Sequence, residues 1–280
     1  MKILVTGVKG QLGHDVVNEA TKRGIEAVGV DIDEMDITNE DEVNSVIKRG
    51  DYDIVVHCAA WTAVDKAEEC IEMCRKVNAN GTEYIANVCH ELDIPLMYFS
   101  TDYVFDGKGE MPWNEYDERN PLNVYGQTKY EGELAVEKLK KHFIVRIAWV
   151  FGKNGNNFIK TMLKLGKERG AVSVVDDQIG SPTYTYDLAK LVVDMIQTDK
   201  YGTYHVTNEG LCSWYDFACE IFKQAGMDNV QVTPVDSTAF PVKAQRPKNS
   251  IMNKNELDKN GFDRLPSWQD ALSRYLEEIK

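Results

Sequence analysis

Short apolar stretches alternate with helical stretches over the first half of the chain, and this alternation restricts the fold more than any other feature. The apolar stretches lie at residues 2–6, 25–30, 53–59, 94–100 and 143–149. The spacing of apolar residues predicts helices between them, at 10–23, 39–48, 68–91 and 122–141. Strands that are apolar on both faces are typical of a parallel sheet covered by helices on both sides. We therefore predict an α/β protein with a doubly wound parallel sheet.

The rhythm loosens beyond residue 150. Helices are predicted near 156–168, 184–197, 213–225 and 267–279, with short apolar runs at 172–175 and 203–206 and a proline-bearing loop at 234–247. We expect residues 1–150, with parts of 170–206, to form a nucleotide-binding domain. Residues 151–280 are then mainly a smaller C-terminal substrate-binding region.

The charge of the chain excludes several classes of function. Lys and Arg total 32 against 45 Asp and Glu, a net charge of −13, so neither nucleic acid nor an anionic membrane is an expected partner. No apolar run approaches the ~18 residues of a membrane span, and the N-terminal apolar stretch is too short for a signal peptide. The six cysteines form no C-x-x-C pair. We expect a cytoplasmic protein with reduced thiols.

A glycine loop follows the first strand and opens the first helix. Gly7, Gly10 and Gly13 are spaced G-x-x-G-x-x-G. In such a loop the first glycine permits a tight turn, the second lets the backbone approach a pyrophosphate, and the third lets helix and strand pack closely. The N-terminus of the helix then offers free N–H groups to an anion. This arrangement predicts a dinucleotide site in an otherwise acidic chain.

Asp31 ends the second strand, where an acid accepts hydrogen bonds from the adenosine ribose. It slightly favours NADH over NADPH, since neither Ile32 nor Asp33 is a cation for a 2′-phosphate. Lys9 in the glycine loop could partly hold a 2′-phosphate, so NADPH remains an alternative cofactor.

Tyr125 and Lys129 lie one helical turn apart and therefore on one face of a helix. A tyrosine with its usual pKa of ~10 is a poor acid at neutral pH. A neighbouring ammonium and the positive ring of an oxidised nicotinamide stabilise the phenolate and lower that pKa. Thr101 follows the fourth strand, at the edge of the sheet where ligands bind, and can hydrogen-bond a substrate carbonyl. The same Ser-Thr-Asp run would also suit a simple turn.

Together these features resemble the extended short-chain dehydrogenase/reductases with a Rossmann fold, and within them the reductases of nucleotide-linked keto sugars. The resemblance covers nearly the whole chain, in the segments 7–13, 59–68, 100–107, 125–133, 145–152, 177–183 and 246–250. It implies hydride transfer from NAD(P)H to C4 of dTDP-4-dehydro-6-deoxy-L-mannose, giving dTDP-L-rhamnose.

The resemblance also implies roles for individual residues. Tyr125 would be the proton donor, Lys129 would hold the nicotinamide ribose and Thr101 would complete a catalytic triad. Residues implied to contact the cofactor are Gly7, Gly10, Gln11, Leu12, Gly13, Asp31, Asp36, Ile37, Ala60, Trp61, Thr62, Phe99, Tyr125 and Lys129. Residues implied to contact the sugar nucleotide are Thr101, Asp102, Trp149, Val64 and Arg246, the last at its diphosphate. Asn78 matches an asparagine that braces the site.

Several alternatives stay open. Tyr103 stands where related dehydratases carry a glutamate, which argues against water elimination. A 4-epimerase or another nucleotide-sugar reductase would share Tyr125 and Lys129, and a non-catalytic regulatory subunit would need only the fold. Some relatives bind a divalent ion at a subunit contact; Asp15 could match one ligand, but no metal site is predicted. A homodimer is also left open.

Overall fold

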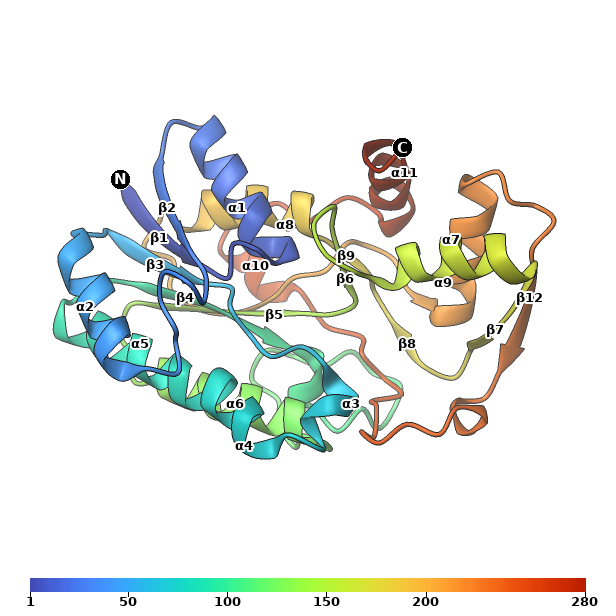
Figure 1. Cartoon of the computed structure of the whole chain (residues 1–280), viewed down its shortest axis with the longest axis horizontal. Helices are drawn as coiled ribbons and strands as arrows, with labels where there is room; N and C mark the ends of the chain where they lie inside the picture. Colours follow the sequence, from blue (N-terminus) through green and yellow to red (C-terminus); the bar gives the residue numbers. More distant parts are fainter.

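A six-stranded parallel sheet lies at the centre of the molecule (Figure 1), in a computed structural model that describes all 280 residues. In spatial order its strands are β10 (Gly202–His205), β5 (His142–Ile147), β4 (Leu96–Thr101), β3 (Ile54–His57), β1 (Lys2–Thr6) and β2 (Glu26–Val30). The chain runs from β1 outward to β2, and then from β3 outward in the opposite direction. This reversal defines a doubly wound sheet, and the predicted fold class is confirmed.

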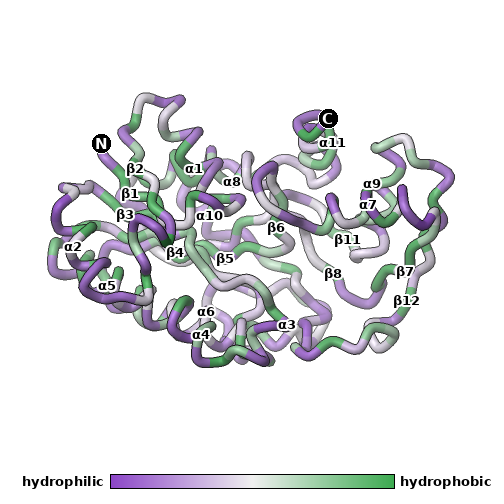
Figure 2. Tube along the Cα trace, in the orientation of Figure 1, coloured by the Kyte–Doolittle hydropathy of each residue, from purple (hydrophilic) through white to green (hydrophobic).

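Helices cover both faces of the sheet. One face carries α1 (Gln11–Lys22) and α8 (Thr185–Met195), and the other carries α2 (Glu40–Gly50), α5 (Gly81–Glu91) and α6 (Val124–Val136) (Figure 1). Side chains alternate along each strand: Ile3 and Val5 pack in the core under α1 and α8, whereas Leu4 packs under α2 and α5. Figure 2 shows the hydrophobic residues gathered along the strands. No helix of the structure has the length and apolar character needed to cross a bilayer.

A third core holds the C-terminal region together, at the right of Figure 1. Its helices are α7 (Phe158–Arg169), α9 (Trp214–Gln224) and α11 (Trp268–Glu278). They pack with a two-stranded sheet of β7 (Ala171–Val175) and β12 (Gln231–Val235). Five further short elements lie in the second half of the chain. Strand β6 (Val150–Phe151) pairs with β9 (Thr183–Tyr184), β8 (Ile179–Gly180) pairs with β11 (Cys212–Ser213), and α10 (Asn255–Lys259) lies near β10. Because β10 belongs to the central sheet and α8 covers it, we propose that both belong to the nucleotide-binding domain.

The long helix predicted at 68–91 is confirmed from Ile71 to Glu91, where it runs without interruption, but it contains a π-helical turn. The structure has α3 (Val64–Ala67), α4 (Ile71–Arg75), a π-helical turn η1 (Lys76–Asn80) and then α5. The wider π turn places the Asn78 amide against the loop that follows β3, and the Thr82 hydroxyl donates to the Asn78 carbonyl at 2.7 Å. A π turn inside a helix is frequent at functional sites.

Other boundaries differ from the prediction in smaller ways. The fifth strand ends at Ile147 rather than at 149, because Trp149 takes a left-handed backbone with φ of 51°. The helix predicted at 122–141 ends at Val136. The loop predicted at 234–247 begins inside β12, and Pro234 is tolerated there because β12 pairs only with β7.

A buried cluster of charges ties α6 to β5. The Arg146 guanidinium donates to both carboxylate oxygens of Glu133 at 2.8 Å, and Arg119 donates to the same carboxylate at 2.9 Å. Burial alone would raise the pKa of Glu133, but hydrogen bonds and charge from the two arginines hold it below its ordinary value. The bidentate pair therefore fixes how α6 lies on the sheet.

Replacing Glu133 by Gln should lower the free energy of unfolding by about 3–5 kcal/mol, because Arg146 then stays buried without a counter-charge. Urea unfolding followed by circular dichroism measures the loss. The matched control is Glu168→Gln, since Glu168 lies 3.9 Å from Lys164 on the exposed face of α7. That variant should lose less than about 0.5 kcal/mol. Equal losses in the two variants would contradict an anchoring role for Glu133.

Candidate active site

The glycine loop between β1 and α1 has the shape of a phosphate cradle. Gly7 has φ of 70°, and a Cβ built on it would lie 2.7 Å from the Ala59 backbone. A Cβ on Gly13 would lie 2.4 Å from the Gly7 carbonyl oxygen. Side chains are thus excluded at both positions, and the unpaired N–H groups of the first turn of α1 are left open to an anion. The cradle fits the pyrophosphate of a dinucleotide.

Asp31 stands beside this cradle. Its carboxylate accepts hydrogen bonds from the backbone N–H of Lys9 at 2.9 Å and of Ile32 at 3.0 Å. The Lys9 ammonium pairs with Asp33 next to it. An acid and a cation therefore occupy the edge where the adenosine ribose of a dinucleotide would lie, the acid suited to ribose hydroxyls and the cation to a 2′-phosphate.

Four of the residues predicted to bind the cofactor use their side chains elsewhere. The Gln11 side-chain oxygen accepts from the Gly152 N–H at 2.9 Å, and Leu12 is buried in the core. The Asp36 carboxylate accepts from the N–H and hydroxyl of Thr38, and Ile37 is buried against α5.

The loop after β3 is held by Asn78. The Asn78 amide accepts from the Trp61 N–H at 2.8 Å and donates to the Trp61 carbonyl at 3.1 Å. It also donates to the Thr128 hydroxyl on α6 at 3.2 Å. The bracing role expected for Asn78 thus has a geometric basis, and it fixes Ala60, Trp61 and Thr62 at the carboxyl edge of the sheet. Phe99, in contrast, is buried in the core of β4.

Helix α6 carries Tyr125 and Lys129 on one face, and its start is well capped. The Asn123 side chain accepts from the Gly126 N–H at 2.8 Å, and Glu68 accepts from the Val124 N–H at 2.8 Å. The Tyr125 ring meets the Tyr103 ring edge-on with centroids 5.5 Å apart. The Thr101 hydroxyl donates to Asp102 at 3.0 Å, and it lies near enough to the Tyr125 phenol to oppose the rise in pKa that burial causes there, so the structure brings these two residues of the predicted triad close together.

Burial moves the pKa values of Tyr125 and Lys129 in opposite directions. It raises the pKa of Tyr125, and the nearby Asp102 and Tyr103 add to the rise against the opposing effect of Thr101. It lowers the pKa of Lys129 to about 7, against the opposing charge of Glu133. The Tyr125–Lys129 spacing predicts that Lys129 lowers the pKa of Tyr125, but in the chain by itself the phenol keeps its proton more firmly than a free tyrosine does.

The Lys129 ammonium has no hydrogen-bond acceptor within the protein. Lys129 is 3% exposed, and its ammonium sits 4.1 Å from the centroid of the Tyr98 ring. No protein acceptor takes a hydrogen bond from it, although buried donors are almost always paired. Ribose hydroxyls of a bound nicotinamide nucleotide would satisfy it. The glycine cradle, Asp31 and Lys129 together fit such a cofactor.

Asp102 and Trp149 are linked by a chain of contacts that runs through Ser250 and Gly180. The Ser250 hydroxyl donates to Asp102 at 2.5 Å, and burial raises the pKa of Asp102 to about 6 against that bond. A Cβ on Gly180 would meet both Ser250 and the Trp149 ring within 3.1 Å, so Gly180 joins them. Trp149 stacks on Trp214 with ring centroids 3.7 Å apart.

Ser250 and Trp214 were not assigned by sequence reasoning. Ser250 lies in the segment 246–250 that carries the family resemblance, and this segment was its only signal.

Arg246 reaches the site from the C-terminal region. Its guanidinium donates to Asp65 at 2.6 Å and to the Tyr103 hydroxyl at 3.4 Å. Val64 begins α3 one residue before Asp65 and is half-buried. Thr101, Asp102, Tyr125, Trp149 and Arg246 therefore belong to one region, at the carboxyl ends of β4 and β5.

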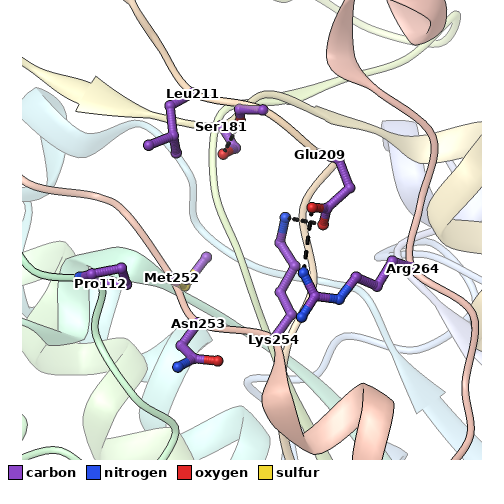
Figure 3. Close-up of a pocket in the computed structure, with 9 residues that line it drawn as sticks. Pro112, Ser181, Glu209, Leu211, Met252, Asn253, Lys254 and Arg264 are labelled. Carbon is purple, nitrogen blue, oxygen red and sulfur yellow. Dashed lines mark hydrogen bonds and ion pairs between the residues drawn. The ribbon is translucent and has the colours of Figure 1, made fainter.

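A separate cavity of about 270 Å³ lies elsewhere, between Ser181, Leu211, Met252 and the loop at Glu209 (Figure 3). Its charged groups are already paired, since Lys254 donates to Glu209 at 2.6 Å and Arg264 donates to Asp258 at 2.6 Å. None of the triad residues lines this cavity, so the candidate active site is placed at the sheet edge instead.

Asp15 does not belong to a cluster of metal-ligating side chains. It accepts a hydrogen bond from the Thr185 hydroxyl at 2.5 Å, and burial raises its pKa. No group of three or more His, Cys, Asp and Glu side chains in the structure is arranged to hold an ion.

A doubly wound sheet, a glycine cradle at β1, an acid at the end of β2 and a Tyr–Lys pair on one helix face define a dinucleotide-binding protein of the short-chain dehydrogenase/reductase type. A family model described as the RmlD substrate binding domain matches residues 1–280. The chain belongs to this family.

Three relatives are similar over nearly the whole chain. A dTDP-4-dehydrorhamnose reductase of Aggregatibacter actinomycetemcomitans is 40% identical over 97% of either chain. The crystal structure of a dTDP-4-dehydrorhamnose reductase from Clostridium acetobutylicum is 43% identical, with a TM-score of 0.97 over 100% of this chain and 99% of that one. That of the Bacillus anthracis reductase in complex with NADP is 44% identical, with a TM-score of 0.96 over 99% and 100%.

The Lys129 amine should lose its proton as the pH rises through about 7, because burial disfavours the charged form. Carbon NMR of lysine labelled at Cε measures this titration, and Lys129→Arg assigns the signal by removing it. Since an unfolded lysine keeps its proton up to about pH 10.4, the unfolded state binds more protons between these values. This group therefore destabilises the fold at low pH, and stability should rise with pH across that window. A Lys129 signal that titrates near 10 would contradict the result.

Proposed function

We propose that the chain reduces dTDP-4-dehydro-6-deoxy-L-mannose to dTDP-L-rhamnose with NADPH or NADH as the hydride donor. The observation that carries the proposal is the unpartnered Lys129 ammonium, one helical turn from the buried Tyr125 phenol on the same face of α6, together with the glycine cradle after β1. The names of the full-length relatives support the same reaction.

In the proposed mechanism, Tyr125 gives its phenolic proton to the C4 oxygen of the keto sugar. The bound reduced nicotinamide supplies the hydride to C4. Burial suits Tyr125 to this role, because a raised pKa keeps the phenol protonated until the ketone oxygen gains negative charge. Thr101 orients the phenol by a hydrogen bond, and Lys129 stabilises the phenolate that remains.

The remaining residues bind and orient the two ligands in this proposal. Gly7, Gly10 and Gly13 would hold the pyrophosphate and Asp31 the adenosine ribose. The backbone of Ala60, Trp61 and Thr62 would line the nicotinamide side. Asp102, Val64 and Trp149 would contact the sugar, and Arg246 would meet the diphosphate.

The direct test is to mix purified protein with each reduced cofactor and a panel of dTDP-linked 4-keto-6-deoxy sugars, and to follow the loss of nicotinamide absorbance. We expect dTDP-4-dehydro-6-deoxy-L-mannose to be reduced faster than the other sugars of the panel. Release of dTDP-L-rhamnose, identified by NMR, confirms the product. Cofactor binding without turnover on any member of the panel would favour the regulatory alternative. Inversion at C4 of a dTDP-linked 4-hydroxy sugar, tested alongside with oxidised cofactor and without net cofactor reduction, would favour an epimerase.

We further propose that the chain works in the cytoplasm. All six cysteines are free in the structure, which suits a reducing compartment. A homodimer is the assembly we propose to test first, by light scattering on the purified chain.

Tyr125→Phe should reduce kcat by about 100- to 10,000-fold, the usual contribution of a general acid, while NADP⁺ affinity changes less than threefold. Tyr130→Phe is the matched control, because it removes the same hydroxyl from the same helix outside the triad. Its kcat should stay within twofold of the unaltered protein. A Tyr125→Phe variant with near-normal kcat would exclude the proposed proton donor.

Lys9→Gln should raise KM for NADPH about tenfold and leave KM for NADH unchanged, because only NADPH has a 2′-phosphate for this ammonium to meet. Steady-state kinetics with both cofactors measures the change. Lys22→Gln, in the last turn of α1, controls for the loss of one positive charge. An equal effect on the two cofactors would show that Lys9 does not face the adenosine ribose.

A further inference from the structure

Helix α3 is short, yet it contacts three parts of the candidate site: the loop after β3, the start of α6, and the segment of residues 236–247. Its Asp65 carboxylate accepts hydrogen bonds from the backbone N–H groups of Lys243 and Ala244, both at 3.2 Å. The same carboxylate accepts from the Arg246 guanidinium at 2.6 Å. Asp65 thus fastens residues 236–247, here called the strap, to the nucleotide-binding domain.

The strap is also fastened to the catalytic helix. The Asn123 side chain, which caps α6, donates to the Gln245 carbonyl at 2.7 Å. On the other side of the same junction, Glu68 at the end of α3 accepts from the Val124 N–H, the first residue of α6. Movement of α3 would therefore displace both the strap and α6, the helix that carries Tyr125 and Lys129.

The cofactor side of the junction is continuous with α3. The loop of Ala60, Trp61 and Thr62 runs directly into Val64, and Asn78 holds Trp61 by two backbone hydrogen bonds. A dinucleotide that orders this loop would order the start of α3, and Asp65 with it.

Arg246 is the cation that this junction positions. Its guanidinium also reaches the Tyr103 hydroxyl at 3.4 Å, and the Tyr103 ring touches Tyr125 edge-on. Two of its five N–H donors are used in these bonds, so the others are free for phosphate oxygens in the fork geometry that arginine offers.

We propose that Asp65 is a positioning residue that links the two ligand sites: it holds the strap and Arg246 in place for the diphosphate of the nucleotide sugar, so that the cofactor and the nucleotide bind cooperatively. The inference rests on the proposed function, because it takes a nucleoside diphosphate as the ligand of Arg246. By linkage, each ligand must then raise the affinity of the other by the same factor.

A competing effect of Asp65 has the opposite sign. A carboxylate beside Arg246 neutralises part of its charge and repels a diphosphate. If charge alone mattered, Asp65→Asn would strengthen nucleotide binding. We favour positioning because two of the three hydrogen bonds to Asp65 come from the strap backbone, which has no net charge to neutralise.

The test measures the affinity of the full chain for deoxythymidine diphosphate by titration calorimetry, with and without saturating NADP⁺. We expect NADP⁺ to raise the affinity of the unaltered protein about fivefold or more. In Asp65→Asn the affinity with NADP⁺ present should fall about tenfold and the gain from NADP⁺ should vanish. At saturating substrate kcat should stay within threefold, so that the loss appears in KM.

Controls separate folding and surface charge from positioning. An unchanged affinity of Asp65→Asn for NADP⁺ shows that the domain is folded. Arg246→Lys keeps the charge and the Asp65 backbone contacts but removes the fork, and it should lose nucleotide affinity in the same direction. Lys243→Ala removes only the surface pair with Glu69 and should behave as the unaltered protein.

Each outcome decides a different question. Nucleotide affinity that is unchanged or higher in Asp65→Asn, or a gain from NADP⁺ that persists there, overturns the positioning role while leaving the reductase proposal intact. An unaltered protein that binds no deoxythymidine diphosphate and reduces no keto sugar overturns the proposed function, and this inference with it.

Discussion

The bidentate pair of Glu133 and Arg146 is the interaction on which the rest of the candidate site depends. Tyr125, Lys129 and Glu133 follow one another at four-residue intervals, so they share one face of α6. Anchoring Glu133 to β5 sets the rotation of the helix about its axis, and this rotation turns Tyr125 and Lys129 to the sheet edge. A buried ion pair contributes little net stability but tolerates few geometries. Here the narrow range of geometries that the ion pair allows keeps α6 in the one rotation that turns Tyr125 and Lys129 toward the sheet edge.

Burial shifts the pKa values of the two candidate catalytic side chains of α6, Tyr125 and Lys129, in opposite directions. The same exclusion of water makes the phenolate of Tyr125 unfavourable and the ammonium of Lys129 unfavourable. Both groups on this helix face therefore favour their neutral forms. In the proposed reaction, the negative charge left on the phenol after proton transfer to the substrate would favour the ammonium form of Lys129, which would take its proton from solvent.

The sequence predicted the sheet and the cradle well because both depend on local patterns. Continuous apolar runs and the spacing of Gly7, Gly10 and Gly13 reflect constraints that act within a few residues. It did not predict the π turn inside the helix at 68–91, because that turn is tied to a contact of Asn78 with Trp61 in a separate segment. The raised pKa of Tyr125 was missed for a similar reason. Desolvation of the phenol and the nearby charges of Asp102 and Tyr103 arise from tertiary packing, whereas the pattern Tyr-x-x-x-Lys shows only the neighbouring ammonium.

Trp149 joins the nucleotide-binding domain to the C-terminal region, because it follows β5 of the central sheet and stacks on Trp214 of α9. Its left-handed backbone is unfavourable for a bulky residue, so the surrounding structure must compensate for it. Stacking on Trp214 from α9 and close contact with Gly180 hold the indole in place, and a side chain at 180 would expel it. The backbone thus leaves β5 in a direction that no regular strand could take. That turn carries an aromatic face from the central sheet to the C-terminal core, so the proposed contact of Trp149 with the sugar depends on both regions being packed together.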